Sequence, residues 1–205
     1  MTSLNTKPSP TVSGGALTHV THFDSKAAVE TYIRSSLPDL PTTYFLAGFY
    51  MSNLPGMFHP DPSTPTPTYT LTLPIPKDSK CIPYYDASHD TGKFVKGILL
   101  NRDATLGKRV LGAQGYQSPQ GIIDGFNKVK EGKAVAKYVD VEPQTWKMYL
   151  PELIREEMME NMVLMPRFGY YGGESLDESH AVSNVDIWGW EGEGRDANGM
   201  VGCRY

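Results

Sequence analysis

The stretch DSKAAVETYIRSSLPDLPTTYFLAGFY, residues 24–50, decides the fold class. Apolar residues recur at helical spacing in its first half, and Pro38 and Pro41 end that helix. Residues 43–50 form a nearly continuous apolar run without alternation, which is typical of a strand buried on both faces of a parallel sheet. A helix that leads into such a strand is the second half of a crossover unit. We therefore expect an α/β protein with parallel strands.

Within this stretch the sequence predicts how the helix begins and which face it shows to solvent. Asp24 is the expected N-cap residue. Glu30 and Arg34 are four residues apart, so we expect them to pair on the outer face of the helix. The apolar residues at helical spacing are Ala27, Val29, Tyr32, Ile33 and Leu37.

The rest of the chain alternates between further helix and strand patterns. The proline-threonine stretch HPDPSTPTPT, residues 59–68, is expected to form a surface loop, and residues 69–74 alternate like an edge strand. Extended segments are expected at residues 82–86, 108–113 and 134–141. One helix is expected to be capped by Asp90 and to run to Asn101, with Phe94, Val95, Ile98 and Leu99 facing inward. Further helices are expected after a cap at Ser118 and at residues 142–150 and 151–165.

The strand that should precede the first helix is missing from the pattern. Residues 3–15 are not strand-like, which favours a chain that begins inside a fold. The alternative is a small α+β domain in which residues 43–50 pair with later strands. We expect residues 1–18 to be loop or disordered, residues 19–180 to form a partial domain, and the glycine-rich residues 181–205 to be an atypical, disordered tail.

Composition excludes several function classes. The 205 residues carry a net charge of −4, so no basic excess favours direct binding to nucleic acid. No apolar run reaches the roughly 18 residues that suggest a membrane span, and the N-terminus lacks the apolar stretch of a secretory signal. Cys81 and Cys203 do not have the spacing of a metal site. These features predict a protein of the cytosol, or of the cytosol and nucleus.

His22 and Lys26 are the first candidate site residues. They are four residues apart, so one helix face can carry both. In reductases a proton-active group four residues before a lysine is a familiar arrangement, in which the lysine binds cofactor ribose hydroxyls. The alternative is a histidine bonded to backbone at a helix start beside a surface lysine. His19 and His22 lack further ligands at suitable spacing, which argues against a metal site.

A second candidate group follows the expected parallel strand. Tyr50, Met51, Ser52 and Asn53 come after its carboxyl end, where open α/β sheets bind ligands. Their hydroxyl and amide groups could contact a ribose or a nicotinamide, whereas the alternative is a plain loop. The sequence contains no G-x-G-x-x-G and no G-x-x-G-x-x-G, so it offers no phosphate-binding loop.

Four motifs taken together resemble the NmrA-like family, atypical members of the short-chain dehydrogenase/reductase superfamily. They are THVTHFDSKAAVETYIR, LPTTYFLAGFYMSNL, YYDASHDTGKFVKGIL and FGYYGGESLDESHA, and they occur in the family's order over residues 13–180. The likeness is greatest to fungal members and to the human NADPH-sensor-like members. It implies the later part of a Rossmann fold that binds NADP(H), with the first half of the parallel sheet missing, followed by a smaller region for substrate or partner.

The resemblance also assigns roles to residues. Lys26 would contact the nicotinamide ribose, and His22 would stand where typical relatives carry the catalytic tyrosine. Tyr50, Met51, Ser52 and Asn53 would lie beside the nicotinamide end of the cofactor. The resemblance implies a redox sensor or transcriptional regulator with a protein partner, weakened in NADPH binding by the absent glycine-rich loop. The alternative is an NAD(P)H-dependent oxidoreductase for a small carbonyl or quinone-like substrate.

Overall fold

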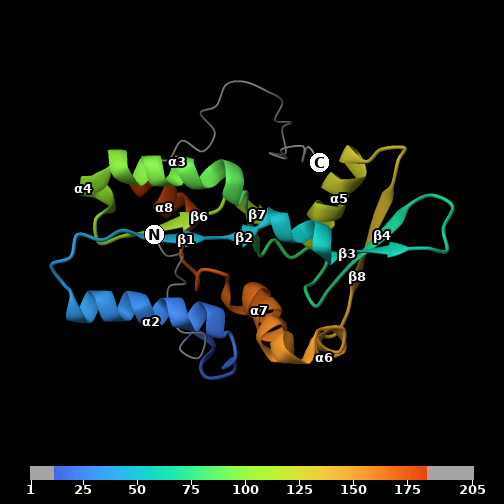
Figure 1. Ribbon diagram of the computed structural model, residues 1–205, viewed down its shortest axis with the longest axis horizontal. Helices are drawn as coiled ribbons and strands as arrows, with labels where there is room; N and C mark the ends of the chain where they lie inside the picture. Colours follow the sequence, from blue (N-terminus) through green and yellow to red (C-terminus); the bar gives the residue numbers. More distant parts are fainter. Residues whose placement is uncertain (1–11, 184–205) are drawn as a thin grey trace.

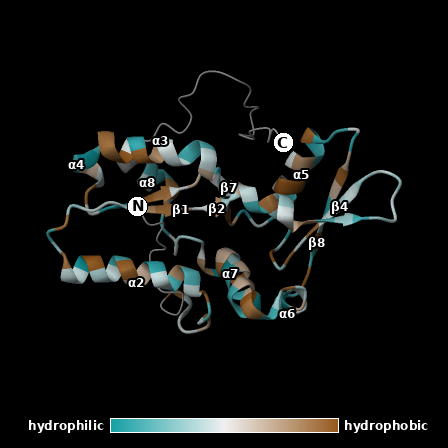
Figure 2. Ribbon diagram, in the orientation of Figure 1, coloured by the Kyte–Doolittle hydropathy of each residue, from teal (hydrophilic) through white to brown (hydrophobic). Residues whose placement is uncertain are grey.

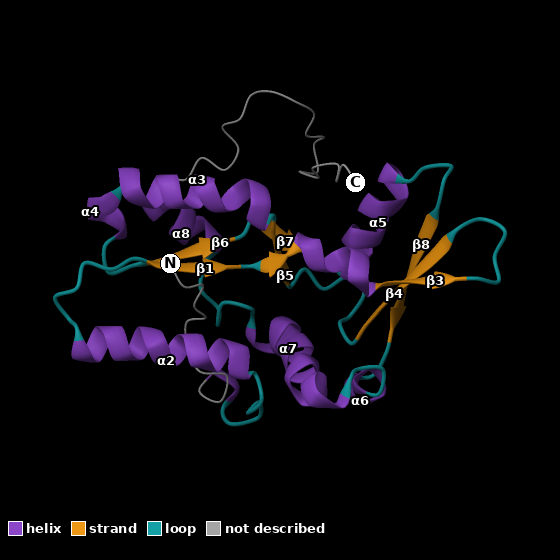
Figure 3. Ribbon diagram, in the orientation of Figure 1, coloured by secondary structure: helices purple, strands orange, loops and turns teal. Residues whose placement is uncertain are grey.

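The computed structural model describes residues 12–183, with side chains to residue 180. Short sheets form its middle layer (Figures 1 and 3). Strand β1 (Tyr44–Ala47) pairs in parallel with β6 (Arg109–Gly112), and β2 (Phe49–Tyr50) pairs in parallel with β5 (Ile82–Tyr85). Strand β5 also pairs with β7 (Gly115–Gln117), in antiparallel fashion. The buried parallel strand expected at residues 43–50 is therefore confirmed.

Helices cover both faces of this layer. Helix α2 (Thr21–Ser36) and helix α7 (Arg155–Phe168) lie on one side of β1 and β2, and α3 (Ala87–Leu100) lies on the other (Figure 1). The short α4 (Arg102–Thr105) follows α3. Strand β1 carries hydrophobic residues along its length (Figure 2), and all four of them are buried. This confirms the α/β fold class.

A third sheet lies beyond these two. Strand β3 (Phe58–Asp61) pairs antiparallel with β4 (Thr68–Leu73), which pairs in parallel with β8 (Val135–Asp140). Helix α5 (Pro119–Val129) packs on β8, and α6 (Pro143–Lys147) packs on β4. The surface loop expected at 59–68 is confirmed for residues 62–67 only, because its first residues belong to β3. The strand expected at 69–74 is confirmed as β4, but its edge position was wrong, because β4 lies between β3 and β8. A 3-10 helix, η1 (Met51–Met57), precedes β3.

Helix α2 begins earlier than its sequence predicts. Val20 occupies the N-cap position and the helix starts at Thr21, so the expected cap at Asp24 was wrong. The physical reason is that Glu157 of α7 accepts the N–H of His22 in the first turn of α2, and Glu160 of α7 binds the N–H of His19 just before it, so no local side chain is needed as a cap. The predicted Glu30–Arg34 pair does form, with Arg34 Nε 2.7 Å from Glu30 Oε1.

Glu30 and Arg34 were both expected on the outer face of the helix, and for Glu30 this expectation was wrong. Its side chain is 2% exposed, and Arg109 of β6 also donates to it, from Nε at 2.9 Å. Arg109 in turn bonds Glu174 at 2.7 Å, so the buried carboxylate joins α2 to the sheet. Val29 and Tyr32 are exposed, because the inward face of α2 carries Phe23, Ala27 and Glu30 instead.

Helix α3 is capped by Asp86, so the expected cap at Asp90 was wrong. The Asp86 carboxylate accepts from the N–H groups of Ser88 and His89. Asp90 is fully buried one turn later and accepts from Gln114 Nε2. Phe94 and Ile98 point inward as expected, whereas Leu99 is 65% exposed.

Several other expectations are confirmed. Ser118 caps α5, its hydroxyl accepting from the N–H of Gly121, and Pro119 is the first residue of the helix. The extended segments at 82–86, 108–113 and 134–141 contain β5, β6 and β8. Residues 142–165 contain α6, the 3-10 helix η2 (Glu152–Ile154) and most of α7.

The far edge of β6 is covered by α8 (Leu176–Ser183) rather than by a strand. Leu111 donates its backbone N–H to Ser179 Oγ at 2.7 Å, and its carbonyl lies 3.1 Å from His180 Nε2. Within residues 12–183, β1 has no strand neighbour other than β6. Most of the tail predicted at 181–205 lies outside the described residues. None of the described helices is long and apolar enough to cross a membrane.

Candidate functional site

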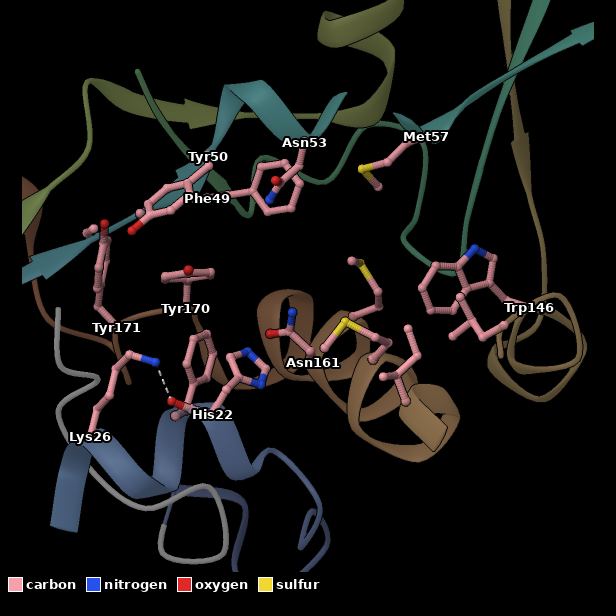
Figure 4. Close-up of a pocket in the computed structure, with 17 residues that line it drawn as sticks. His22, Lys26, Phe49, Tyr50, Asn53, Met57, Trp146, Asn161, Tyr170 and Tyr171 are labelled. Carbon is pink, nitrogen blue, oxygen red and sulfur yellow. Dashed lines mark hydrogen bonds between the residues drawn. The ribbon is translucent and has the colours of Figure 1, made fainter. Parts of the chain in front are cut away.

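A cavity of about 480 Å³ lies where α2 faces the junction of β1 and β2 (Figure 4). His22 and Lys26 line it from α2, while Tyr50 and Asn53 line it from the turn after β2. The structure thus brings four of the six sequence-predicted site residues to one cavity. The rest of the wall is mostly apolar and includes Phe23, Phe49, Met57, Trp146, Met158, Met162, Tyr170 and Tyr171.

The start of α2 is held in place by two glutamates of α7. Glu160 Oε2 accepts the backbone N–H groups of Thr18 at 2.7 Å and His19 at 2.6 Å. Glu157 Oε1 accepts the backbone N–H of His22 at 2.7 Å. These carboxylates also place negative charge at the positive end of the helix dipole. The place of His22 in the cavity is therefore fixed by helix α7, which is distant from it in the sequence.

The His22 ring is bonded to the same carboxylate. Its Nδ1 lies 2.6 Å from Glu157 Oε1, and a carboxylate can only accept, so Nδ1 carries the proton. In the neutral ring Nε2 then keeps its lone pair. Partial burial opposes ionisation of Glu157, but hydrogen bonds from Thr21 and His22 hold its pKa below the ordinary value.

Lys26 has a bond within its own helix. Its Nζ donates to the backbone carbonyl of His22 at 2.7 Å (Figure 4). An ammonium group has three donors, so this bond leaves capacity for further acceptors. The side chain is only half-buried, which leaves that capacity accessible from the cavity.

Residues of the turn after β2 line two different cavities. Tyr50 and Asn53 face the cavity of His22, whereas Met51 lines a second cavity of about 560 Å³ on the other side of η1. Ser52 is exposed and lines neither of these two. The 3-10 turn causes this division, because successive residues of a helical turn point in different directions.

Two residues of the site escape sequence reasoning. Asn161 of α7 is 7% exposed, lines the cavity, and its Oδ1 is buried without a hydrogen-bond partner among the described residues. Trp146 of α6 forms the far end of the cavity, its Nε1 donating to the carbonyl of Thr72 at 2.8 Å. No local motif marks either residue, since folding alone brings α6 and α7 beside α2.

Tyr170 and Tyr171 bring phenol groups to the cavity wall. Burial raises the pKa of Tyr170, and also that of Tyr171, so both phenols are neutral near pH 7. Within residues 12–183 no group of three His, Cys, Asp or Glu side chains could hold a metal ion. His19 and His22 bind separate glutamates, Glu160 and Glu157.

Parallel strands, covering helices and a cavity at the carboxyl ends of β1 and β2 define an α/β chain with a Rossmann-like arrangement. A family model described as the NmrA-like family matches residues 5–196. The chain therefore belongs to the NmrA-like family, as its motifs indicated. No curated protein matches it.

Solved structures support the fold. The chain is similar to NmrA, a negative transcriptional regulator, in complex with NADP, at 22% identity and a TM-score of 0.66. It is also similar to NmrA in complex with NAD, at 20% identity and a TM-score of 0.64. Each match covers 95% of this chain and 61% of the NmrA chain. A nucleoside-diphosphate-sugar epimerase from Staphylococcus aureus matches at 17% identity and a TM-score of 0.56. This match covers 89% of the present chain and 58% of the epimerase chain.

Proposed function

We propose that this chain supplies the nicotinamide end of an NADP(H) site in a regulator that senses the dinucleotide. The observation that carries the proposal is the meeting of His22 and Lys26 with Tyr50 and Asn53 in one cavity. Helix α2 and the turn after β2 contribute these residues independently. A site at the carboxyl ends of parallel strands is where sheets of this class bind ligands.

The residues present fit a nicotinamide ribose. Lys26 would donate to the ribose hydroxyls with the N–H groups that His22 does not use. The side chains of Asn161 and Asn53 add polar residues to a wall that is otherwise mostly apolar. Such a wall suits a flat ring with few polar atoms. When bound, the dinucleotide would supply hydride chemistry or report the redox state.

The nature of His22 favours a sensor over an enzyme. Its Nδ1 is held by Glu157. By the family resemblance, its ring would stand where typical relatives carry a phenol. Transfer of a phenolic proton is therefore not open to this chain at that position. The solved NmrA structures are of a negative transcriptional regulator with NADP or NAD, which supports a regulatory role through a protein partner.

We expect the 205-residue chain to bind the dinucleotide weakly. Its sequence has no glycine-rich loop to hold the pyrophosphate at a helix N-terminus. The chain spans 61% of the length of the NmrA chain that it matches, so the activity of a whole relative is not assumed for it.

One observation favours a second function, an NAD(P)H-dependent oxidoreductase. The cavity extends beyond His22 to Trp146, which leaves room for a small carbonyl or quinone-like substrate beside the cofactor. In that case the imidazole would handle the proton in place of the usual phenol.

Calorimetric titration with NADPH and an NADPH oxidation assay separate these functions. The sensor proposal expects heat of binding, a weaker Kd in Lys26→Ala, an unchanged Kd in the exposed control Lys80→Ala, and no oxidation of NADPH with carbonyls or quinones. Oxidation that disappears in His22→Phe would favour the enzyme. A Lys26→Ala variant that binds NADPH as well as the parent would contradict the proposed role of the lysine.

A further inference from the structure

The second cavity, of about 560 Å³, takes no part in the proposed dinucleotide site. Met51 and Leu54 line it from η1, and Ile122 and Phe126 line it from α5. It lies on the other side of η1 from the cavity of His22, and its volume is in the range of sites that bind small molecules. The cavity is therefore a candidate binding site in its own right.

The wall of this cavity combines aromatic contacts with helical glycines. The ring centroid of Phe126 lies 4.9 Å from that of Phe58 on β3 and 5.5 Å from that of Tyr69 on β4. Gly121 and Gly125 also line the cavity from α5, one helical turn apart. Glycine is unfavourable inside a helix, but here it leaves room beside the aromatic rings.

The residues that line the cavity are spread along the whole length of α5. Gln117, just before the helix, lines it at one end, and Lys130, just after the helix, lines it at the other. An α-helix rises about 1.5 Å per residue, so the 11 residues of α5 span about 16 Å. This form suits an elongated apolar molecule.

Two lysines and no carboxylate line the cavity. Lys130 is half-buried and Lys133 is exposed. The backbone N–H of Lys133 donates to the carbonyl of Lys130 at 2.8 Å, so one tight turn holds both residues at the same end of α5. Within the part of the chain that the structure describes, neither ammonium group has a hydrogen bond or an ion pair. Because the whole chain carries a net charge of −4, these lysines form a local site for an anion.

We propose that this cavity binds an elongated apolar carboxylate of the fatty-acid class. Its tail lies along α5, where burial against the apolar wall stabilises it. Its carboxylate lies at the turn, where Lys130 and Lys133 donate charge-assisted hydrogen bonds to it. Binding does not require the dinucleotide, so this proposal and the proposed function can fail separately.

The test compares decanoate with 1-decanol, which has the same tail and no charge. Ligand-observed NMR titration of the 205-residue chain without dinucleotide, below the concentration at which decanoate forms micelles, gives both affinities. We expect decanoate to bind, and the double variant Lys130→Gln/Lys133→Gln to bind decanoate about tenfold more weakly with an unchanged affinity for decanol. No binding of decanoate, or parent-like binding in the double variant, would overturn the proposal.

A matched control separates a local site from an effect of net charge. The double variant Lys80→Gln/Lys96→Gln removes the same charge from two exposed lysines outside the cavity wall. It should bind decanoate as the parent does. An equal loss of affinity in this control would overturn the proposal.

Two further variants locate the tail and the carboxylate. Leu54→Gln places a polar amide in the apolar wall and should weaken the binding of both probes. Lys26→Ala changes the cavity of His22 instead and should leave the affinity for decanoate unchanged. Loss of decanoate binding in Lys26→Ala would place the carboxylate in the cavity of His22, and unchanged binding of both probes in Leu54→Gln would place the tail elsewhere. Either result would overturn the proposal.

Discussion

His22 Nδ1 and Glu157 Oε1 lie 2.6 Å apart, although the two residues are separated by 135 positions in the sequence. The same carboxylate oxygen accepts the backbone N–H of His22 and the hydroxyl of Thr21. Helix α7 therefore caps the helix that carries both His22 and Lys26. Changes on α7 should affect the candidate site as well as the stability of the fold.

Replacing Glu157 by Gln should destabilise the protein by about 1.5–3 kcal/mol at pH 7, the usual worth of hydrogen bonds to a charged group. The pKa of Glu157 is lowered in the folded state, so its contribution is present above the unfolded value of 4.5 and is lost as pH falls through the folded value. Urea unfolding of both proteins measures this. The difference should shrink below about pH 4.5, and Glu131→Gln on the surface is the control.

The pair formed by His19 and Glu160 should respond to pH in the opposite direction. The carboxylate of Glu160 accepts from the ring and raises the pKa of His19 above 6.5. The stabilisation is therefore full below pH 6.5 and disappears as pH rises through the raised value. NMR titration of the His19 ring should give a lower pKa in Glu160→Gln. An unchanged pKa in that variant would contradict the pairing.

Removal of the buried carboxylate of Glu30 should be among the most damaging single changes. Glu30→Ala leaves Arg34 and Arg109 without the group that both of them bind. Breaking a buried pair costs about 3–5 kcal/mol. Denaturant unfolding should show that loss, and Glu131→Ala on the surface should change stability by less than about 0.5 kcal/mol. A loss below about 1 kcal/mol for Glu30→Ala is the value of a solvent-exposed ion pair and would contradict the burial of this carboxylate.

Gly48 should not tolerate a side chain. A Cβ there would lie 2.5 Å from the carbonyl oxygen of Pro83 and 2.8 Å from the Tyr171 hydroxyl. Gly48→Ala should therefore cost about 1–3 kcal/mol and narrow the cavity. Gly92→Ala is the matched control, because a Cβ at Gly92 on helix α3 meets nothing within 4 Å and alanine favours helix. A parent-like melting temperature for Gly48→Ala would contradict this packing.

The sequence predicted the elements whose signals are local. The apolar run around Leu46 is buried on both faces, and Ser118 with Pro119 marks the start of α5. The start of α2 could not be found in this way, because Glu157 of another helix caps its first turn and Glu160 of that helix holds the residues just before it. Strand β3 was missed because its sequence contains Pro60, which weakens a strand pattern.

The candidate site was predictable in its α2 and β2 parts only. Helical spacing of His22 and Lys26 indicated a shared face, and the strand end indicated Tyr50 and Asn53. Asn161 gave no signal, since a single asparagine in a methionine-rich helix has no motif. The burial of Glu30 was also hidden, because its partner Arg109 lies on a strand 79 positions away.

The most direct test of the proposed site is saturation-transfer NMR of NADP with the 205-residue chain, which reports the part of the ligand that touches the protein. We predict stronger saturation of the nicotinamide and adjoining ribose protons than of the adenine protons, because Lys26, Tyr50 and Asn53 line the cavity proposed for the nicotinamide end. We also predict that Lys26→Ala lowers the nicotinamide signals and that Lys80→Ala does not. Stronger adenine signals, or nicotinamide signals unaffected by Lys26→Ala, would contradict the proposed site.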